Sequence, residues 1–320
     1  MKSLRIIYMG TPAFAVAPLG SLLINGFNVA GVVTAPDRPA GRGRKMAMSP
    51  VGIFAQSSNL PLLQPGNLRS PDFIDRLKQF DADIFVVVAF RMLPEVVWAM
   101  PGLGTINLHA SLLPQYRGAA PVNHVLINGE KTTGVTTFLI DHKIDTGNIL
   151  MREEVQILPE DNAGDLSNRL MKHGAKLIIS TIAGIAENSL RPRPQSDFML
   201  PGELLKTAPK IFASDTLIDW NKDAESVNNL VRGLSPDPGA RFTLRCKSSE
   251  KLIKVFESIP ETTEHSLGPG KVLSDGTKHF KVACGKGFLS ILNLQPEGRK
   301  RMSSEDFLRG FKPDDTCMAN

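Results

Sequence analysis

The feature that most constrains the fold is an alternation, in the first half of the chain, of short apolar runs with helix-start signals. The runs have the composition of strands and cover residues 4–10, 28–34, 84–90, 105–108, 134–140 and 149–157. A polar cap followed by proline, which favours the start of a helix, occurs at Thr11-Pro12, Ser49-Pro50 and Ser70-Pro71. A longer helix is predicted over 161–187. This alternation predicts an α/β domain with a Rossmann-like parallel sheet and helices on both faces.

The pattern changes after Arg191-Pro192-Arg193-Pro194, which cannot continue a helix. From about Ala208 the apolar runs are short and separated by glycine and proline, which indicates a small β-rich domain. Its strands are predicted over 242–246, 251–256, 271–273, 280–283 and 289–294, after one amphipathic helix over 224–233. We therefore divide the chain into a first domain (1–190), a linker (191–207) and a second domain (208–320).

Charge and cysteine content narrow the possible partners. The net charge is +5, so any contact with nucleic acid must come from a local cluster. One basic loop holds Arg38, Arg42, Arg44 and Lys45, which on composition alone is a solvated loop. Three cysteines with no short spacing argue against a disulfide framework or a zinc site and fit a reducing compartment. The apolar start is too short for a membrane span, and we expect a cytoplasmic protein.

The segment 105–111 carries the clearest chemical signal. Side chains two apart on a strand face the same way, so Asn107 and His109 should point together. They end a strand of a parallel sheet, where such folds place ligands. An amide beside an imidazole suits stabilisation of an oxyanion, although a polar pair that merely closes the strand is an equal alternative. Asp145, in an acidic turn, is a candidate partner for His109; it could instead bond its own backbone.

These motifs resemble those of a known family. N-x-H-x-S-L-L-P (107–114), R-G-A-A-P (117–121) and I-D-T-G (144–147) are similar to those of the folate-dependent formyltransferases, and most closely to the methionyl-tRNA formyltransferases. The resemblance covers nearly the whole chain. It also includes residues 9–12 and 35–43, Ile218-Asp219-Trp220 and Leu294-Gln295-Pro296.

The resemblance implies roles for individual residues. Asn107, His109 and Asp145 would be catalytic, and Ser111, Leu112, Leu113 and Pro114 would line the folate. Arg42, in the basic loop, would contact tRNA. The implied co-substrate is 10-formyltetrahydrofolate and the implied acceptor is initiator methionyl-tRNA, with no metal, no membrane and a monomeric enzyme.

The resemblance also assigns the two domains. The first would be the catalytic, folate-binding domain, and the second an OB-like barrel that binds tRNA. Phe90, Arg91 and Lys143 depart from the family pattern where the pterin ring would sit.

Several alternatives stay open at this stage. A formyltransferase acting on a purine precursor or a sugar nucleotide would share Asn107, His109 and Asp145, although the small purine enzyme lacks a second domain. A hydrolase of formylfolate would use water in place of the amine. A tRNA-binding module with an inactive folate domain is a further possibility, which the three intact residues argue against. A nicotinamide oxidoreductase is disfavoured because the G-x-G-x-x-G fingerprint is absent.

Overall fold

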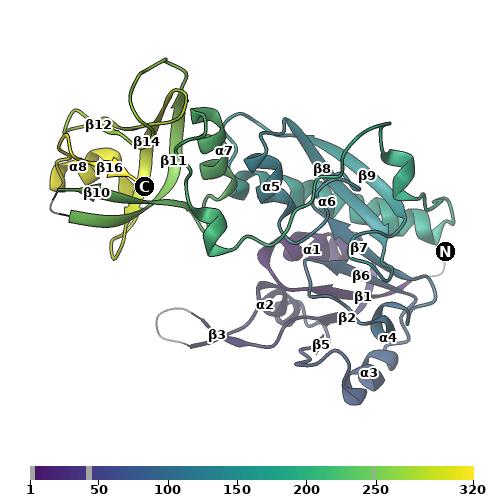
Figure 1. Cartoon of the computed structure of the whole chain (residues 1–320). Coiled ribbons are helices and arrows are strands. Elements are labelled where there is room, and N and C mark those ends of the chain that lie inside the picture. The colour runs from purple at the N-terminus through teal and green to yellow at the C-terminus, as the bar shows by residue number, and fades with distance from the viewer. Residues whose placement is uncertain (1–3, 41–44, 248) are drawn as a thin grey trace. The chain divides into compact units, whose positions relative to one another are not determined.

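The chain forms two compact units in the computed structural model, which describes residues 4–40, 45–247 and 249–320 (Figure 1). The first unit comprises residues 1–118, 132–156 and 167–207. The second comprises residues 119–131, 157–166 and 208–320. The second unit therefore takes up two short segments from the first half of the sequence in addition to the C-terminal region.

The first unit is built on a seven-stranded sheet in the order β5-β2-β1-β6-β7-β8-β9. Its strands are β1 (Arg5–Gly10), β2 (Asn28–Val33), β5 (Leu62–Leu63), β6 (Ile84–Val88), β7 (Thr105–His109), β8 (Thr132–Leu139) and β9 (Ile149–Gln156). A separate hairpin pairs β3 (Arg38–Ala40) with β4 (Lys45–Ala47).

The predicted Rossmann-like parallel sheet is confirmed, with antiparallel strands added at one edge. The five strands from β5 to β7 are parallel, but β8 runs antiparallel to both β7 and β9. Only residues 140–148 join β8 to β9, and this is too short for the crossover that parallel neighbours need. The sheet is therefore mixed. Its parallel part runs from β5 to β7, the strand that carries Asn107 and His109.

Helices begin mostly where the cap-proline pairs predict. The helices are α1 (Val16–Ile24), α2 (Pro50–Ser57), α3 (Pro71–Lys78), α4 (Glu95–Trp98) and α6 (Ala163–Ala186), with short 3-10 turns at Ala13–Ala15 and Gln195–Phe198. Ser49 Oγ accepts the backbone N–H of Gly52 at 3.0 Å, and Ser70 Oγ accepts that of Phe73 at 3.4 Å. Thr11 is not a cap, because Pro12 itself takes the N-cap position in extended conformation and the chain turns one residue later.

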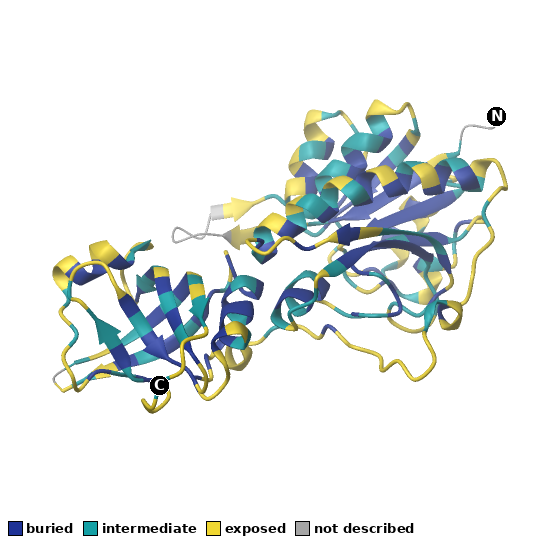
Figure 2. Ribbon diagram, turned by 90° about the horizontal axis from the view of Figure 1, so that it is seen from above, coloured by how far each residue is buried: buried dark blue, intermediate teal, exposed yellow. Residues whose placement is uncertain are grey.

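Helices cover both faces of the sheet, as predicted. One face carries Met9 and Val87, which pack in one cluster with Phe73 of α3 and Val97 of α4. On the other face, Leu108 lies against Gly174 of α6 so closely that a Cβ there would be 2.7 Å from the leucine side chain. The strands between these layers are buried (Figure 2).

The second unit is a nearly closed antiparallel barrel, which confirms the predicted β-rich domain. Its sheet has the order β12-β13-β14-β11-β10-β16, and a bridge between Lys271 and Met318 links its two ends. The elements are α7 (Ala224–Gly233), β10 (Ala240–Cys246), β11 (Ser249–Glu261), β12 (Val272–Ser274), β13 (Phe280–Ala283), β14 (Phe288–Pro296), β15 (Met302–Ser303), α8 (Ser304–Gly310) and β16 (Met318–Ala319), with a 3-10 turn at Ala213–Thr216. Helix α5 (Pro121–Ile127) packs on α7, where the Asn123 amide donates to the carbonyl of Gly233 at 2.7 Å.

The expectation that the cysteines form no disulfide framework is wrong for one pair. Cys246 and Cys317, 71 residues apart, form a disulfide. They meet because β10 pairs with β16, in the register Leu244 to Ala319 and Arg245 to Met318, which sets Cys317 opposite Cys246. Sequence spacing gave no sign of this long-range pairing. Cys284 is buried, and burial raises the pKa of its thiol to about 12.

Among the residues that the structure describes, no helix is both long enough and apolar enough to span a bilayer.

Candidate active site

Asn107 and His109 lie on one face of β7, at the carboxyl end of the parallel strands. Asn107 pairs with Val87 of β6, and paired residues of neighbouring strands point to the same face of a sheet. The side chains of Asn107 and His109 therefore lie on the face that carries α3 and α4. Ile106 and Leu108 point to the opposite face, and both are buried. The strand alternation predicted from the sequence therefore holds in the structure.

His109 is buried between two oxygen acceptors. Its Nε2 lies 2.9 Å from the backbone carbonyl of Tyr116, and its Nδ1 lies 3.7 Å from Oδ2 of Asp145. A carbonyl can only accept a hydrogen bond, so Nε2 must carry a proton. The Nδ1 side of the ring faces the carboxylate of Asp145.

Asp145 is held in place by backbone geometry as well as by its side chain. It has φ +55°, a left-handed conformation that few residues other than glycine adopt. Its Oδ2 accepts the backbone N–H of Gly118 at 2.9 Å, and its side chain is only 11% exposed. At Gly147 a Cβ would lie 1.6 Å from the carbonyl oxygen of Leu139, so only glycine fits this end of the turn.

Asn107 differs from its neighbours because its amide is not engaged. The residue is partly exposed, and its side chain makes no hydrogen bond to any residue in the described ranges. The amide N–H groups can therefore donate to a bound molecule at the edge of the sheet.

The segment Ser111 to Pro114 is a mostly buried loop that the side chain of Thr136 ties down. The side chains of Ser111, Leu113 and Pro114 are buried, and Leu112 is partly exposed. The hydroxyl of Thr136 donates to the carbonyl of Ser111 at 2.6 Å and accepts from the N–H of Leu113 at 3.2 Å. Of the four, Leu112 alone offers a part-exposed side chain to a ligand.

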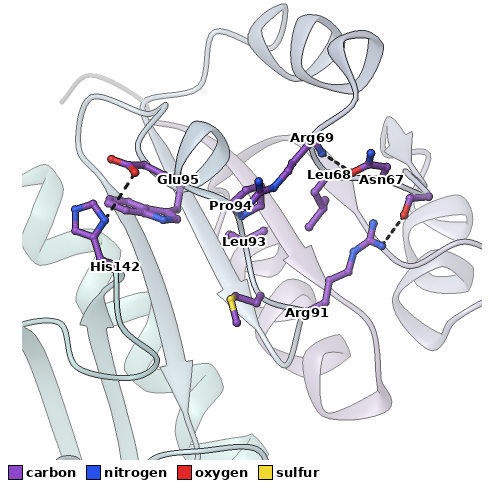
Figure 3. Close-up of a pocket in the computed structure, with 11 residues that line it drawn as sticks. Asn67, Leu68, Arg69, Arg91, Leu93, Pro94, Glu95 and His142 are labelled. Carbon is purple, nitrogen blue, oxygen red and sulfur yellow. Dashed lines mark hydrogen bonds and ion pairs between the residues drawn. The ribbon is translucent and has the colours of Figure 1, made fainter.

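A pocket of about 510 Å³ opens in the same unit, beyond the end of β6 (Figure 3). Its walls are residues 66–69, residues 91–95, Trp98 and His142. At one end Glu95 Oε2 lies 3.8 Å from His142 Nδ1, and Trp98 meets the His142 ring edge-on. Because His142 belongs to the turn that carries Asp145, the pocket and the catalytic candidates share a loop.

Arg91 fixes one wall of this pocket. Its guanidinium donates to the carbonyls of Pro65 and Gly66, the latter at 3.0 Å, and its Nε is buried without a partner among the described residues. Burial, and next the charge of Arg38, lower the pKa of Arg91 below its ordinary value. Lys143, the other charged departure from the family pattern, is exposed in the turn after β8.

Sequence reasoning missed several of these residues. The pocket wall at 66–69 has no motif, although Pro65-Gly66 signals a turn. Gln195 was also missed, and it donates hydrogen bonds to the backbone of the Asp145 turn. Arg42 lies outside the described residues. Within the described ranges, no group of three or more His, Cys, Asp or Glu side chains could hold a metal ion.

Sequence profiles of known families match both units. The profile described as Formyl transferase matches residues 2–182, and that of the Formyl transferase C-terminal domain matches residues 210–312. The chain belongs to the formyl transferase family.

Named relatives of this formyl transferase are similar over nearly its whole length. Methionyl-tRNA formyltransferase of Bacteroides thetaiotaomicron is 49% identical over 320 residues, which is 100% of this chain and 99% of the relative. The protein of the same name from Flavobacterium johnsoniae is 48% identical over 311 residues, 97% of each chain.

Solved structures share the fold of this formyl transferase. WlaRD, a sugar 3N-formyl transferase, superposes with a TM-score of 0.64 at 21% identity, covering 94% of this chain and 100% of that one. HypX from Aquifex aeolicus, solved with tetrahydrofolic acid, has a TM-score of 0.63 at 16% identity. The match covers 98% of this chain but only 49% of HypX, so the chain spans about half the length of that protein.

Proposed function

We propose that this protein transfers the formyl group of 10-formyltetrahydrofolate to the α-amino group of methionyl initiator tRNA. Full-length similarity at 49% identity to a methionyl-tRNA formyltransferase supports the choice of substrates. The observation that carries the chemistry is the grouping of Asn107, His109 and Asp145 at the carboxyl edge of β7, with 3.7 Å between His109 Nδ1 and Asp145 Oδ2.

The reaction forms a bond between the amine nitrogen and the formyl carbon and breaks the bond between that carbon and N10 of the folate. The lone pair of the methionyl α-amine attacks that carbon, and the carbonyl oxygen becomes an oxyanion. The intermediate then collapses, the bond from carbon to N10 of the folate breaks, and N10 takes up a proton. The attacking nitrogen loses a proton, so the overall reaction neither consumes nor releases protons.

Asn107 and His109 are assigned to the oxyanion. Donors that are already in place where charge develops lower the barrier most. The amide of Asn107 is unengaged by described residues, and His109 Nδ1 is too far from Asp145, at 3.7 Å, for a direct hydrogen bond. The amide of Asn107 and the Nδ1 side of His109 are therefore assigned to a substrate oxygen.

Asp145 is assigned to the proton balance. Its carboxylate lies beside the ring of His109 and can accept the amine proton, directly or through water. The hydrogen bond from Gly118 holds Oδ2 while leaving further lone pairs for a proton.

The folate is assigned to the pocket and the adjoining loop. Arg91, Trp98 and His142 line the pocket, whose volume of about 510 Å³ lies in the range of small-molecule sites. The segment Ser111 to Pro114 adjoins His109 in the chain, and its partly exposed side chain is Leu112. Residues 1–190 thus form the catalytic, folate-binding part of the proposed enzyme.

The tRNA is assigned to the basic loop with Arg42 and to the barrel of residues 208–320, with 191–207 as the connection. Guanidinium groups bind phosphates and base edges, and Arg42 lies between two glycines in a run of cations. The proposal includes action as a monomer in the cytoplasm, where charged tRNA is used.

A direct assay tests the proposal. The purified protein is incubated with methionyl initiator tRNA and 10-formyltetrahydrofolate, and the amino acid released from the tRNA is analysed for formylmethionine. Methionyl elongator tRNA and an amino-sugar nucleotide serve as competing acceptors. Formylmethionine on the initiator tRNA is expected, and its absence together with formylation of the sugar would overturn the proposal.

A further inference from the structure

Gln195 is a buried polar residue that the sequence motifs do not single out. It begins the 3-10 turn Gln195–Phe198 and is only 5% exposed. Its Nε2 donates to the carbonyl of Asp145 and to that of Gly147, each at 2.9 Å. Its Oε1 accepts from Arg117, at 3.0 Å from Nε and 2.6 Å from Nη2. Both ends of the amide are thus engaged, all within the first unit.

The two carbonyls belong to the turn that presents the proposed catalytic carboxylate. Asp145 has φ +55°, a left-handed conformation that aspartate tolerates better than most residues other than glycine. One amide that donates to the carbonyls on both sides of Thr146 fixes the path of the backbone across this turn. The position of the Asp145 side chain follows from that path.

Arg117, which donates to the Oε1 end of the Gln195 amide, belongs to the segment that holds His109. Arg117 lies between Tyr116, whose carbonyl receives His109 Nε2, and Gly118, whose N–H donates to Asp145 Oδ2. Gln195 therefore connects the two backbone segments that set the distance between His109 and Asp145.

We propose that Gln195 is a positioning residue for formyl transfer, acting through Asp145. Its hydrogen bonds go to Arg117 and to the turn of Asp145, and it does not line the pocket, so its effect passes through those two segments. The inference rests on the proposed function, because it concerns the turnover of that reaction.

Two substitutions separate this role from simple anchoring of Arg117. Gln195→Glu keeps two oxygens for the guanidinium of Arg117 but removes the donor and sets a carboxylate against the carbonyls of Asp145 and Gly147. Gln195→Ala removes both contacts. If the turn is what matters, kcat at saturating substrates should fall about 10- to 100-fold in both variants, the size expected from a small misplacement of a reacting group.

A double-mutant cycle distinguishes positioning of Asp145 from a merely structural role of Gln195, because only positioning makes the kcat loss of Gln195→Ala depend on Asp145. In an Asp145→Asn background, Gln195→Ala should lower kcat by no more than about twofold, because residues that act through one another are not additive. Asn123→Ala is the matched control, since it removes another side-chain amide that donates to a backbone carbonyl, that of Gly233. It should lower the melting temperature without lowering kcat.

Two results would overturn the proposal: wild-type kcat in Gln195→Glu, or losses that multiply in the double variant. Melting curves identify a variant that fails to fold, and Gln195→Glu, which keeps the Arg117 contact, serves where Gln195→Ala does not fold. The wild-type enzyme in the same assay tests the proposed function independently. Its failure to make formylmethionine is distinct from a failure of Gln195 to matter.

Discussion

Asp145→Asn removes the carboxylate charge next to His109 and little else. The asparagine has nearly the same volume, and its side-chain oxygen can still accept the N–H of Gly118. A unit positive charge that develops on the His109 ring in the transition state would lie 3.7 Å from the carboxylate and be attracted by roughly 4 kcal/mol at an effective dielectric of about 20. If this attraction serves the transition state, its loss lowers the rate by about 10³-fold, within the range of about 10²–10⁴ for general acid–base groups.

The assay for this variant is single-turnover formyl transfer to methionyl initiator tRNA, with both substrates at saturating concentration. The melting temperature should stay close to that of the wild-type protein, because the buried hydrogen bond is kept. Asp83→Asn is the matched control. Asp83 also accepts a backbone N–H, that of Arg5 at 2.8 Å, but it lies just before β6, at the amino end of the parallel strands, whereas His109 lies at their carboxyl end. Its rate should be unchanged.

The reasoning fails if Asp145→Asn retains a rate within about threefold of the wild-type enzyme. A variant that loses both rate and thermal stability would point to a structural function of the carboxylate instead.

Three further predictions concern the oxyanion, the tRNA contact and the barrel. Asn107→Ala should lower kcat by about 10²–10³-fold, the typical loss of one oxyanion donor, while folate affinity measured by calorimetry changes little; a loss of affinity alone would contradict the role. Arg42→Leu, outside the described residues, should weaken tRNA binding and reduce the salt dependence of that binding by about one unit of slope, with folate binding unchanged. If the variant binds tRNA like the wild-type protein at every salt concentration, the loop is only a solvated turn. In the barrel, the hydrogen bond from Lys281 at 2.7 Å, and then that from Ser290 at 2.6 Å, hold the pKa of Glu261 below its ordinary value. Because the folded-state pKa is lowered, this stabilisation is present above the ordinary pKa and is lost as pH falls through the folded one. Glu261→Gln should therefore lower the free energy of unfolding by up to about 1 kcal/mol at pH 7, and the difference should vanish in acid urea titrations.

Local patterns were enough to predict most elements. Ser49-Pro50 and Ser70-Pro71 marked the starts of α2 and α3, because a cap and a proline act within one turn of chain. The amphipathic run Ala224–Gly233 is α7 as predicted. The facing of Asn107 and His109 followed from strand alternation alone.

Pairings between distant segments were not predictable in the same way. The antiparallel direction of β8 depends on which strand it meets, and the disulfide of Cys246 and Cys317 depends on the pairing of β10 with β16. No sequence pattern linked helix α5 to the second unit, and only packing places Asn123 against Gly233 of α7. None of these partners lies within a few residues in the chain.

The candidate site likewise has features that follow from local sequence and features that depend on tertiary packing. The sequence by itself determined the residue types at the strand end, the turn before Gly147 and the resemblance that linked Asn107, His109 and Asp145. Only the tertiary structure decided the 3.7 Å between His109 and Asp145, the pocket wall of Arg91 and the hydrogen bonds of Gln195 to a turn 50 residues earlier. The physical reason is that strand alternation and helix caps act over a few residues, whereas the distance between two side chains far apart in sequence depends on how the whole unit packs.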